Sequence, residues 1–156
     1  MIRPFRSETE RYGEYSKSGE YIYDRPFLWG SKRTGPDLHR QGGKYPDSWH
    51  FNHMLEPESM SPGSIMPPYP WLISNDVDLS LVPAKIRVLR TLGTPYEPGY
   101  EEIAIEDAQK QANIVAQSLR KDGIDMEGLE NKEIVALIAY LQRLGTDIKP
   151  KPQAGN

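Results

Sequence analysis

One methionine stands in a loop whose composition holds its sulfur in place. Met66 lies within residues 64–72, and prolines occupy three of the four positions that follow it. Because each proline fixes its own φ, the thioether is presented in a defined direction. A thioether held in this way suits a soft or borderline metal, above all the iron of a haem. The alternative is a methionine that packs under a proline-rich loop, and the loop alone does not separate the two.

The histidines are the second set of side chains with metal chemistry. His50 and His53 are three residues apart on a short helix predicted over residues 48–55, so their rings share a face, and His39 lies upstream. Two helical histidines can begin a metal site but do not complete one. Since no carboxylate flanks them at a matching offset, we expect surface or capping histidines. A small metal site that combines the histidines with a methionine sulfur stays as an alternative.

Composition limits the classes of protein to which the chain can belong. Its 156 residues include 14 prolines and 13 glycines, and only 37% are hydrophobic, which predicts one loop-rich domain. The 19 basic and 22 acidic residues form no basic tract, so nothing favours nucleic acid. The chain contains no cysteine, which excludes disulfides, zinc–thiolate sites and thioether attachment of haem by this chain. The longest apolar run, residues 134–141, is too short to cross a membrane, and we expect a soluble chain.

The elements that must position these side chains divide the chain into two halves. Residues 1–72 hold all three histidines and all three tryptophans with little periodicity, so this half is predicted to build a ligand site from loops. Residues 73–148 show helical spacing, and residues 149–156 form a polar tail that we expect to fray. No segment alternates as a strand does. The pattern predicts an all-α fold with three to four helices.

Three helices are predicted in the second half. The first ends before Gly93 and has Ser80 as its expected cap, because a proline must sit in the first turn. The second covers residues 100–121, with acidic side chains at its start, basic side chains at its end and Gly123 at the C′ position. The third covers about residues 131–144.

Three features in fixed order resemble class I cytochromes c. They are Thr34-Gly35-Pro36-Asp37-Leu38, then Met66-Pro67-Pro68-Tyr69, then the helix that ends in Leu144-Gly145-Thr146. Residues 1–8, 27–40, 45–50 and 60–67 look like the mono-haem subunit II of cbb3-type cytochrome c oxidases. The match is dense up to about residue 72, returns in the last helix, and is looser over residues 73–130.

The resemblance implies a haem c site and assigns roles to matching positions. Met66 would be the distal iron ligand, and the carbonyl of Pro36 would orient the proximal histidine. Leu38 and Leu137 would pack on the haem, whereas Tyr69 and Trp71 would flank the methionine loop.

The resemblance also implies a function and partners. The chain would relay electrons from a donor cytochrome toward the catalytic oxidase subunit, in a complex on the periplasmic side of the bacterial inner membrane. No catalytic activity is expected of the isolated chain, because the redox chemistry belongs to the cofactor.

In that family a membrane anchor and a Cys-x-x-Cys-His motif precede the segment that resembles residues 1–8. We therefore expect a truncated, haem-deficient form that lacks the helix which crosses the last one. The face formed by Ile134, Ile138 and Leu141 would then be uncovered and would favour a homo-oligomer, or the chain would fold loosely. A haem-free scaffold that docks on an oxidase or cytochrome partner is the alternative function.

Overall fold

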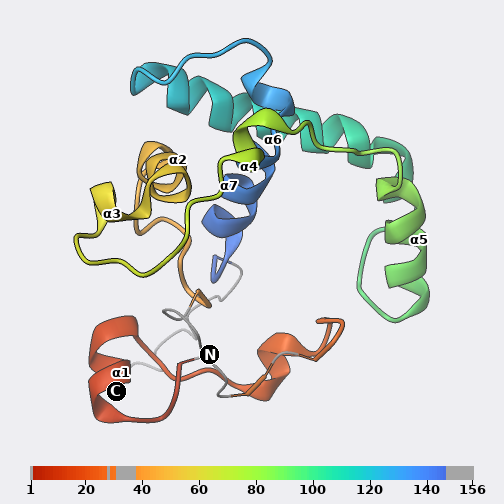
Figure 1. Ribbon diagram of the computed structural model, residues 1–156. Helices are drawn as coiled ribbons and strands as arrows, with labels where there is room; N and C mark the ends of the chain where they lie inside the picture. Colours follow the sequence, from red (N-terminus) through yellow and green to blue (C-terminus); the bar gives the residue numbers. More distant parts are fainter. Residues whose placement is uncertain (1, 28, 31–37, 147–156) are drawn as a thin grey trace, which may run out of the picture. The chain divides into compact units, whose positions relative to one another are not determined.

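The computed structural model describes residues 2–27, 29–30 and 38–146, and this part of the chain is helical (Figure 1). An isolated bridge pairs Asp76 with Lys132, and the described residues form no strand. The elements in chain order are α1 (Arg6–Tyr12), the 3₁₀ helix η1 (Ser18–Tyr21), α2 (Asp47–Leu55), α3 (Pro57–Met60), α4 (Trp71–Ser74), α5 (Val82–Thr91), α6 (Tyr100–Lys121), the 3₁₀ helix η2 (Leu129–Asn131) and α7 (Glu133–Arg143). The predicted all-α class is confirmed.

The four longest helices, α2, α5, α6 and α7, are those that the sequence predicts, and helical periodicity predicts the last three of them. Helix α6 has the predicted bounds, and Gly123 beyond its end has a φ of +86°, a conformation that other residues rarely adopt. The expected cap of α5 was wrong. Leu81 stands at the N-cap, while the amide of Ser80 donates to Asp78 Oδ1 at 2.8 Å and so lies in the preceding turn. Helix α7 begins two residues later than predicted because residues 129–131 form η2.

Helices α1, α3 and α4 were not predicted. They are four to seven residues long, and segments this short cannot show a helical repeat. Helix α3 begins at Pro57, where the fixed φ of proline suits a first turn. Helix α3 precedes the Met66 loop and α4 follows it, so these two helices determine where that loop starts and ends.

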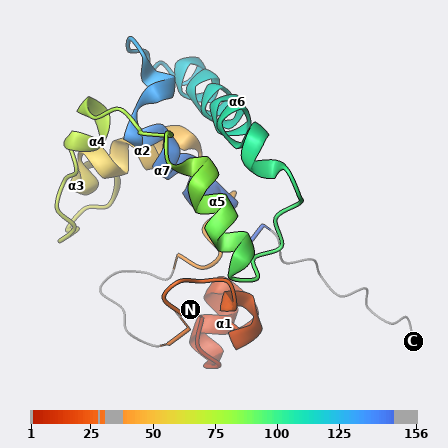
Figure 2. The same cartoon turned by 90° about the vertical axis from the view of Figure 1, so that its right-hand side faces the viewer.

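The main core lies where α2, α6, η2 and α7 meet (Figures 1 and 2). Its buried side chains are Phe51, Val115, Ala116, Leu119, Leu129, Ile134, Val135 and Ile138. This arrangement corrects one expectation. Ile134 and Ile138 are fully buried and Leu141 is 3% exposed, so the face of the last helix is not uncovered. Side chains of this same chain supply the covering that was expected to be missing.

Helices α5 and α6 pack together away from that core (Figure 1). Ile86 and Ala104 are buried there. The guanidinium of Arg90 donates two hydrogen bonds to the carboxylate of Glu101, at 2.7 and 2.8 Å, and so ties the end of α5 to the start of α6. A bidentate pair of this kind fixes direction as well as distance.

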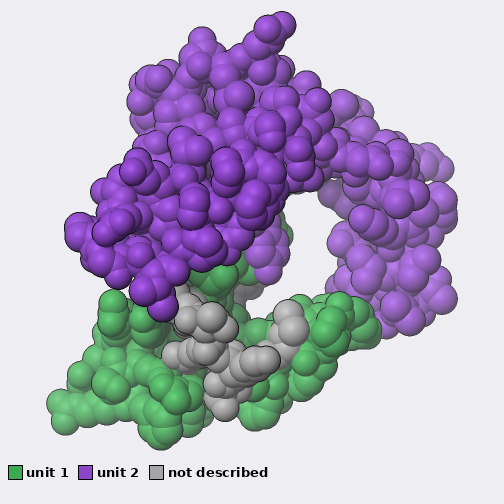
Figure 3. Space-filling model, in the orientation of Figure 1, with its two compact units in different colours: residues 1–44, 141–156 green, residues 45–140 purple. Residues whose placement is uncertain are grey.

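The contacts group the chain into two compact units, coloured separately in Figure 3. One comprises Met1–Lys44 and Leu141–Asn156, and the other comprises Tyr45–Tyr140. In the first unit the amide of Gly42 donates to the carbonyl of Leu144 at 2.9 Å, which joins a turn to the end of α7. The predicted division near residue 72 rests on composition rather than on contacts and stays a prediction. The predicted tail, residues 149–156, lies outside the described residues.

Candidate functional site

The loop that carries Met66 is tied at both ends within the second unit. The amide of Met66 donates to Ser64 Oγ at 3.2 Å, and the amide of Tyr69 donates to the carbonyl of Met54 at 2.8 Å. The second bond attaches the loop to α2. Met66 itself is half-buried, whereas the preceding Ile65 is 97% exposed. The Met66 side chain is therefore only partly covered by the rest of the chain.

Two aromatic rings lie directly after Met66. The rings of Tyr69 and Trp71 meet edge to face, with centroids 5.2 Å apart and planes at 75°. Trp71 begins α4 and is 49% exposed, while Leu72 and Ile73 of the same helix pack against the core. Because Leu72 and Ile73 hold α4 against the core, the indole of Trp71 stays at the surface, directly after the loop in sequence.

The remaining predicted site residues lie elsewhere. Leu137 is half-buried on α7 of the second unit. Leu38 belongs to the first unit and is 47% exposed. Pro36 lies outside the described residues. The structure therefore brings together Met66, Tyr69 and Trp71 along one short segment, and the roles expected of Pro36, Leu38 and Leu137 stay predictions.

The expectation of surface histidines on α2 was wrong for His50. This side chain is 2% exposed, and its Nε2 atom is buried without a hydrogen-bond partner. His53 is half-buried, and its Nδ1 atom is buried and unpartnered too. Burial lowers the pKa of both imidazoles, and for His50 the opposing influence of Asp47 is smaller. Both rings are therefore neutral at neutral pH.

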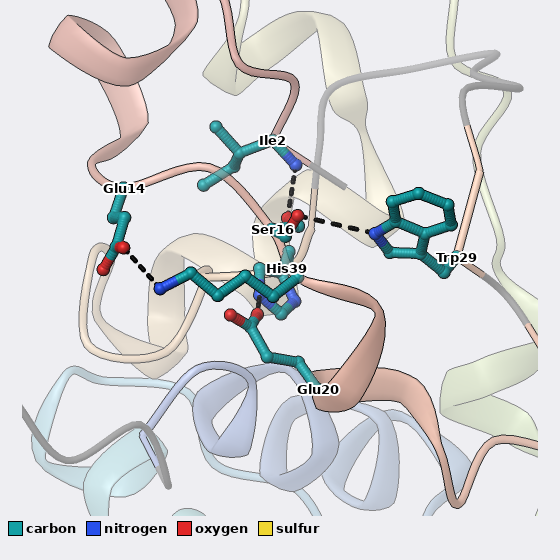
Figure 4. A network of polar contacts seen from close by, with 7 residues as sticks. Ile2, Glu14, Ser16, Glu20, Trp29 and His39 are labelled. Atoms are coloured by element: carbon teal, nitrogen blue, oxygen red, sulfur yellow. Dashed lines mark hydrogen bonds and ion pairs between the residues drawn. The ribbon is translucent and has the colours of Figure 1, made fainter.

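The third histidine belongs to a polar network in the first unit (Figure 4). His39 Nε2 pairs with the carboxylate of Glu20, and its ring stacks on Tyr21. In the same region the amide of Ile2 donates to Ser16 Oγ at 2.6 Å, and the amide of Ser16 donates back to the carbonyl of Ile2 at 2.8 Å. These bonds hold the buried Ile2 in place. Within the ranges that the structure describes, no group of three or more histidine, aspartate and glutamate side chains is arranged to hold a metal ion.

Sequence reasoning missed an aromatic stack on α2. Tyr45 and Trp49 stack with centroids 4.1 Å apart, and Trp49 and His53 stack at 4.4 Å. A signal was present for one of the two contacts, since Trp49 and His53 are four apart on the helix and are therefore neighbours on one face. Tyr45 precedes the helix, and local sequence gave no signal for its contact with Trp49.

The residues around Met66 fit a haem. A soft sulfur donor lies at the edge of the fold, and Trp71 presents an apolar face beside it. Two buried imidazole nitrogens in this unit have no protein partner, which polar groups on a bound ligand would satisfy. Methionine sulfur is an established axial ligand of haem iron in electron-transfer proteins. The chemistry of these residues therefore fits a haem, and the role of Met66 as its ligand stays a prediction.

Comparison with protein families shows to which family the chain belongs. Residues 1–148 match the family described as cytochrome C oxidase, mono-heme subunit/FixO. The chain belongs to this family. The mono-haem oxidase subunits are components of a cytochrome oxidase, so the family confirms the resemblance to cytochrome c subunits and implies a haem and oxidase partners. A comparison with curated proteins finds no match.

A helix that crosses a bilayer must be about 20 residues long and predominantly apolar. Among the helices formed by the described residues, none is long and apolar enough to cross a membrane. The longest, α6, carries charged side chains at both ends and along its length.

Proposed function

We propose that the chain binds one haem without covalent attachment of its own and relays single electrons within a cytochrome oxidase complex, with Met66 as the distal ligand of the iron. The observation that carries the proposal is the Met66 loop: a half-buried thioether, attached to α2 through the bond from Tyr69 to Met54, in a chain that matches the mono-haem subunit family. The haem supplies the reversible one-electron chemistry. The polypeptide determines where the haem is held and tunes its reduction potential.

Each neighbouring side chain has a defined task in this proposal. The sulfur of Met66 would hold the iron, and such a ligand would raise the reduction potential relative to a second nitrogen ligand. Tyr69 and Trp71 would flank the methionine loop. By the family resemblance, Leu38 and Leu137 would pack on the haem, and the carbonyl of Pro36 would orient the proximal histidine.

Thioether attachment needs cysteines from outside the 156 residues, because these contain none. The chain by itself therefore holds haem only without covalent bonds. In the complex we propose that electrons come from a donor cytochrome and leave toward the oxygen-reducing subunit, on the periplasmic side of the bacterial inner membrane. Residues 1–148 form the cytochrome c-like domain, with the ligand half in residues 1–72 and the helical half in residues 73–148.

A haem-free scaffold that docks on the oxidase or on a cytochrome is the second candidate, and the lack of cysteine favours it. Self-association through the last helix was expected because its apolar face was thought to be exposed. Ile134 and Ile138 are buried, so this expectation no longer applies. Size-exclusion chromatography at several concentrations measures the oligomeric state directly, and a monomer is the expected result.

Titration of the chain with ferric haem tests the proposal. We expect a Soret band distinct from that of free haem, saturation at one haem per chain, and complete loss of the haem into acidic acetone. A spectrum identical to free haem at every ratio contradicts haem binding by this chain. Retained binding to the oxidase in that case supports the scaffold function.

A further inference from the structure

The rings of Tyr45, Trp49 and His53 form a continuous stack. Tyr45 and Trp49 have centroids 4.1 Å apart and planes inclined by 15°, and Trp49 and His53 have centroids 4.4 Å apart and planes inclined by 17°. Trp49 and His53 are four residues apart on α2 and so point to one side of it, whereas Tyr45 precedes the helix and its N-cap Pro46. Near-parallel rings at these separations are in van der Waals contact.

The stack runs from the surface into the fold. Tyr45 is 43% exposed, Trp49 and His53 are half-buried, and His53 Nδ1 is buried. His50, which is 2% exposed, meets the rings of Trp49 and Tyr45 edge-on, at 5.4 and 6.2 Å and with planes at 88° in both cases. Tyr45, at one end of the stack, is thus exposed to water, whereas the imidazole rings of His50 and His53 contact the indole of Trp49.

The chemistry of these rings favours electron exchange over metal binding. Indole and phenol are among the side chains that lose one electron most readily, and contact between their π faces lets an electron pass directly between them. A cation beside the indole would oppose its oxidation. Burial lowers the pKa of both neighbouring imidazoles and so disfavours their cationic forms.

We propose that Tyr45 and Trp49 form a hole relay, which passes oxidising equivalents from the interior to solvent. An oxygen-derived one-electron oxidant, such as the carbonate radical, removes one electron from the indole of Trp49. Tyr45 returns one electron to the indole and releases its phenolic proton to water, so the radical moves to the exposed phenol. A small-molecule reductant in solvent, such as ascorbate, then supplies one electron and one proton and restores Tyr45. This function concerns side chains alone and does not depend on haem binding.

Pulse radiolysis of the haem-free chain with azide radicals tests the relay. Azide radicals oxidise tryptophan first, and the conversion of tryptophan radical to tyrosine phenoxyl radical is followed by absorption. We expect a fast first-order conversion whose rate does not change with protein concentration, and ascorbate is expected to remove the phenoxyl signal. The absence of any concentration-independent conversion in the unmodified chain overturns the proposal.

Three variants assign the conversion to this stack. Tyr45→Phe keeps a stacked ring but removes the phenol, and Trp49→Phe removes the indole, so each is expected to lose the fast phase. Trp29→Phe is the matched control, because none of the ring contacts among the described residues involves Trp29, and it is expected to keep the fast phase. Tyr45→Phe removes only the hydroxyl group of a side chain that is 43% exposed, so this variant is expected to fold as the unmodified chain does, which circular dichroism checks. A fast phase of unchanged rate and amplitude in Tyr45→Phe overturns the relay.

Discussion

The amide of Tyr69 donates a 2.8 Å hydrogen bond to the carbonyl of Met54, and this bond attaches the Met66 loop to α2. It joins the loop that carries the thioether to the helix that carries His50, His53 and the aromatic stack. A proline-rich segment has few amides of its own with which to make such a bond. The Tyr69 amide is one of them, so the position of the sulfur depends strongly on it.

The first prediction concerns the core that supports this helix. Leu119 is fully buried between α6 and its neighbours, so Leu119→Ala is expected to lower the free energy of unfolding by about 2–5 kcal/mol. Ile114→Ala on the same helix is the matched control. Its side chain is 68% exposed, and the expected change is within about 0.5 kcal/mol. Urea unfolding followed by circular dichroism measures both, and equal effects would refute this assignment of the core.

The second prediction concerns the turn that meets the end of α7. A Cβ atom at position 42 would lie 2.4 Å from the carbonyl oxygen of Gln142 and 2.7 Å from that of Leu144, both of which are backbone atoms. Gly42→Ala is therefore expected to destabilise the first unit by about 1–3 kcal/mol. Gly30→Ala, where a Cβ meets nothing within 4 Å, is expected to be neutral. Hydrogen exchange of the Gly43 amide, which bonds to Gln142 Oε1 at 2.9 Å, reports the loss locally.

The third prediction is a pH dependence of stability that arises from His50. Burial lowers the pKa of this histidine in the folded chain, so the unfolded chain binds more protons once the pH falls below the ordinary histidine value of about 6.5. Stability is then complete above that pH and declines as the pH falls toward the folded-state pKa. Asp47 opposes this shift, whereas His53 reinforces it.

Unfolding by urea at a series of pH values, for the unmodified chain and for His50→Gln, measures this contribution. The variant is expected to lose part of the decline because it removes the titrating group. An identical pH profile in both proteins would show that His50 does not titrate differently on folding.

Much of the fold followed from periodicity, and the reasons for the failures are specific. Helix α6 could be predicted to the residue because its charged ends and Gly123 mark both limits. The covering of Ile134 and Ile138 could not be predicted, since side chains of the same core, such as Phe51 and Leu119, come from segments far from α7 in sequence. Burial of His50 was missed for the same reason: a helix sequence alone does not show which of its faces another helix will cover.

The candidate site, like the fold, could be predicted from the sequence only in part. The composition around Met66 predicted a loop that holds a sulfur, and the structure has a tied loop with that sulfur at its edge. The roles of Leu38 and Leu137 on a haem came from family resemblance alone and stay predictions, because local sequence does not determine which side chains pack on a bound group.

Substitution of Met66 in the haem-loaded chain tests the central claim most directly. Visible and near-infrared absorption of the ferric form, together with the reduction potential, is measured for the unmodified chain, for Met66→Ala and for Met60→Ala. Iron ligation by Met66 predicts that only Met66→Ala loses the sulfur-to-iron charge-transfer band and that its potential falls, because a methionine ligand raises the haem potential. Met60→Ala is expected to match the unmodified chain. An unchanged spectrum and potential in Met66→Ala would contradict the account.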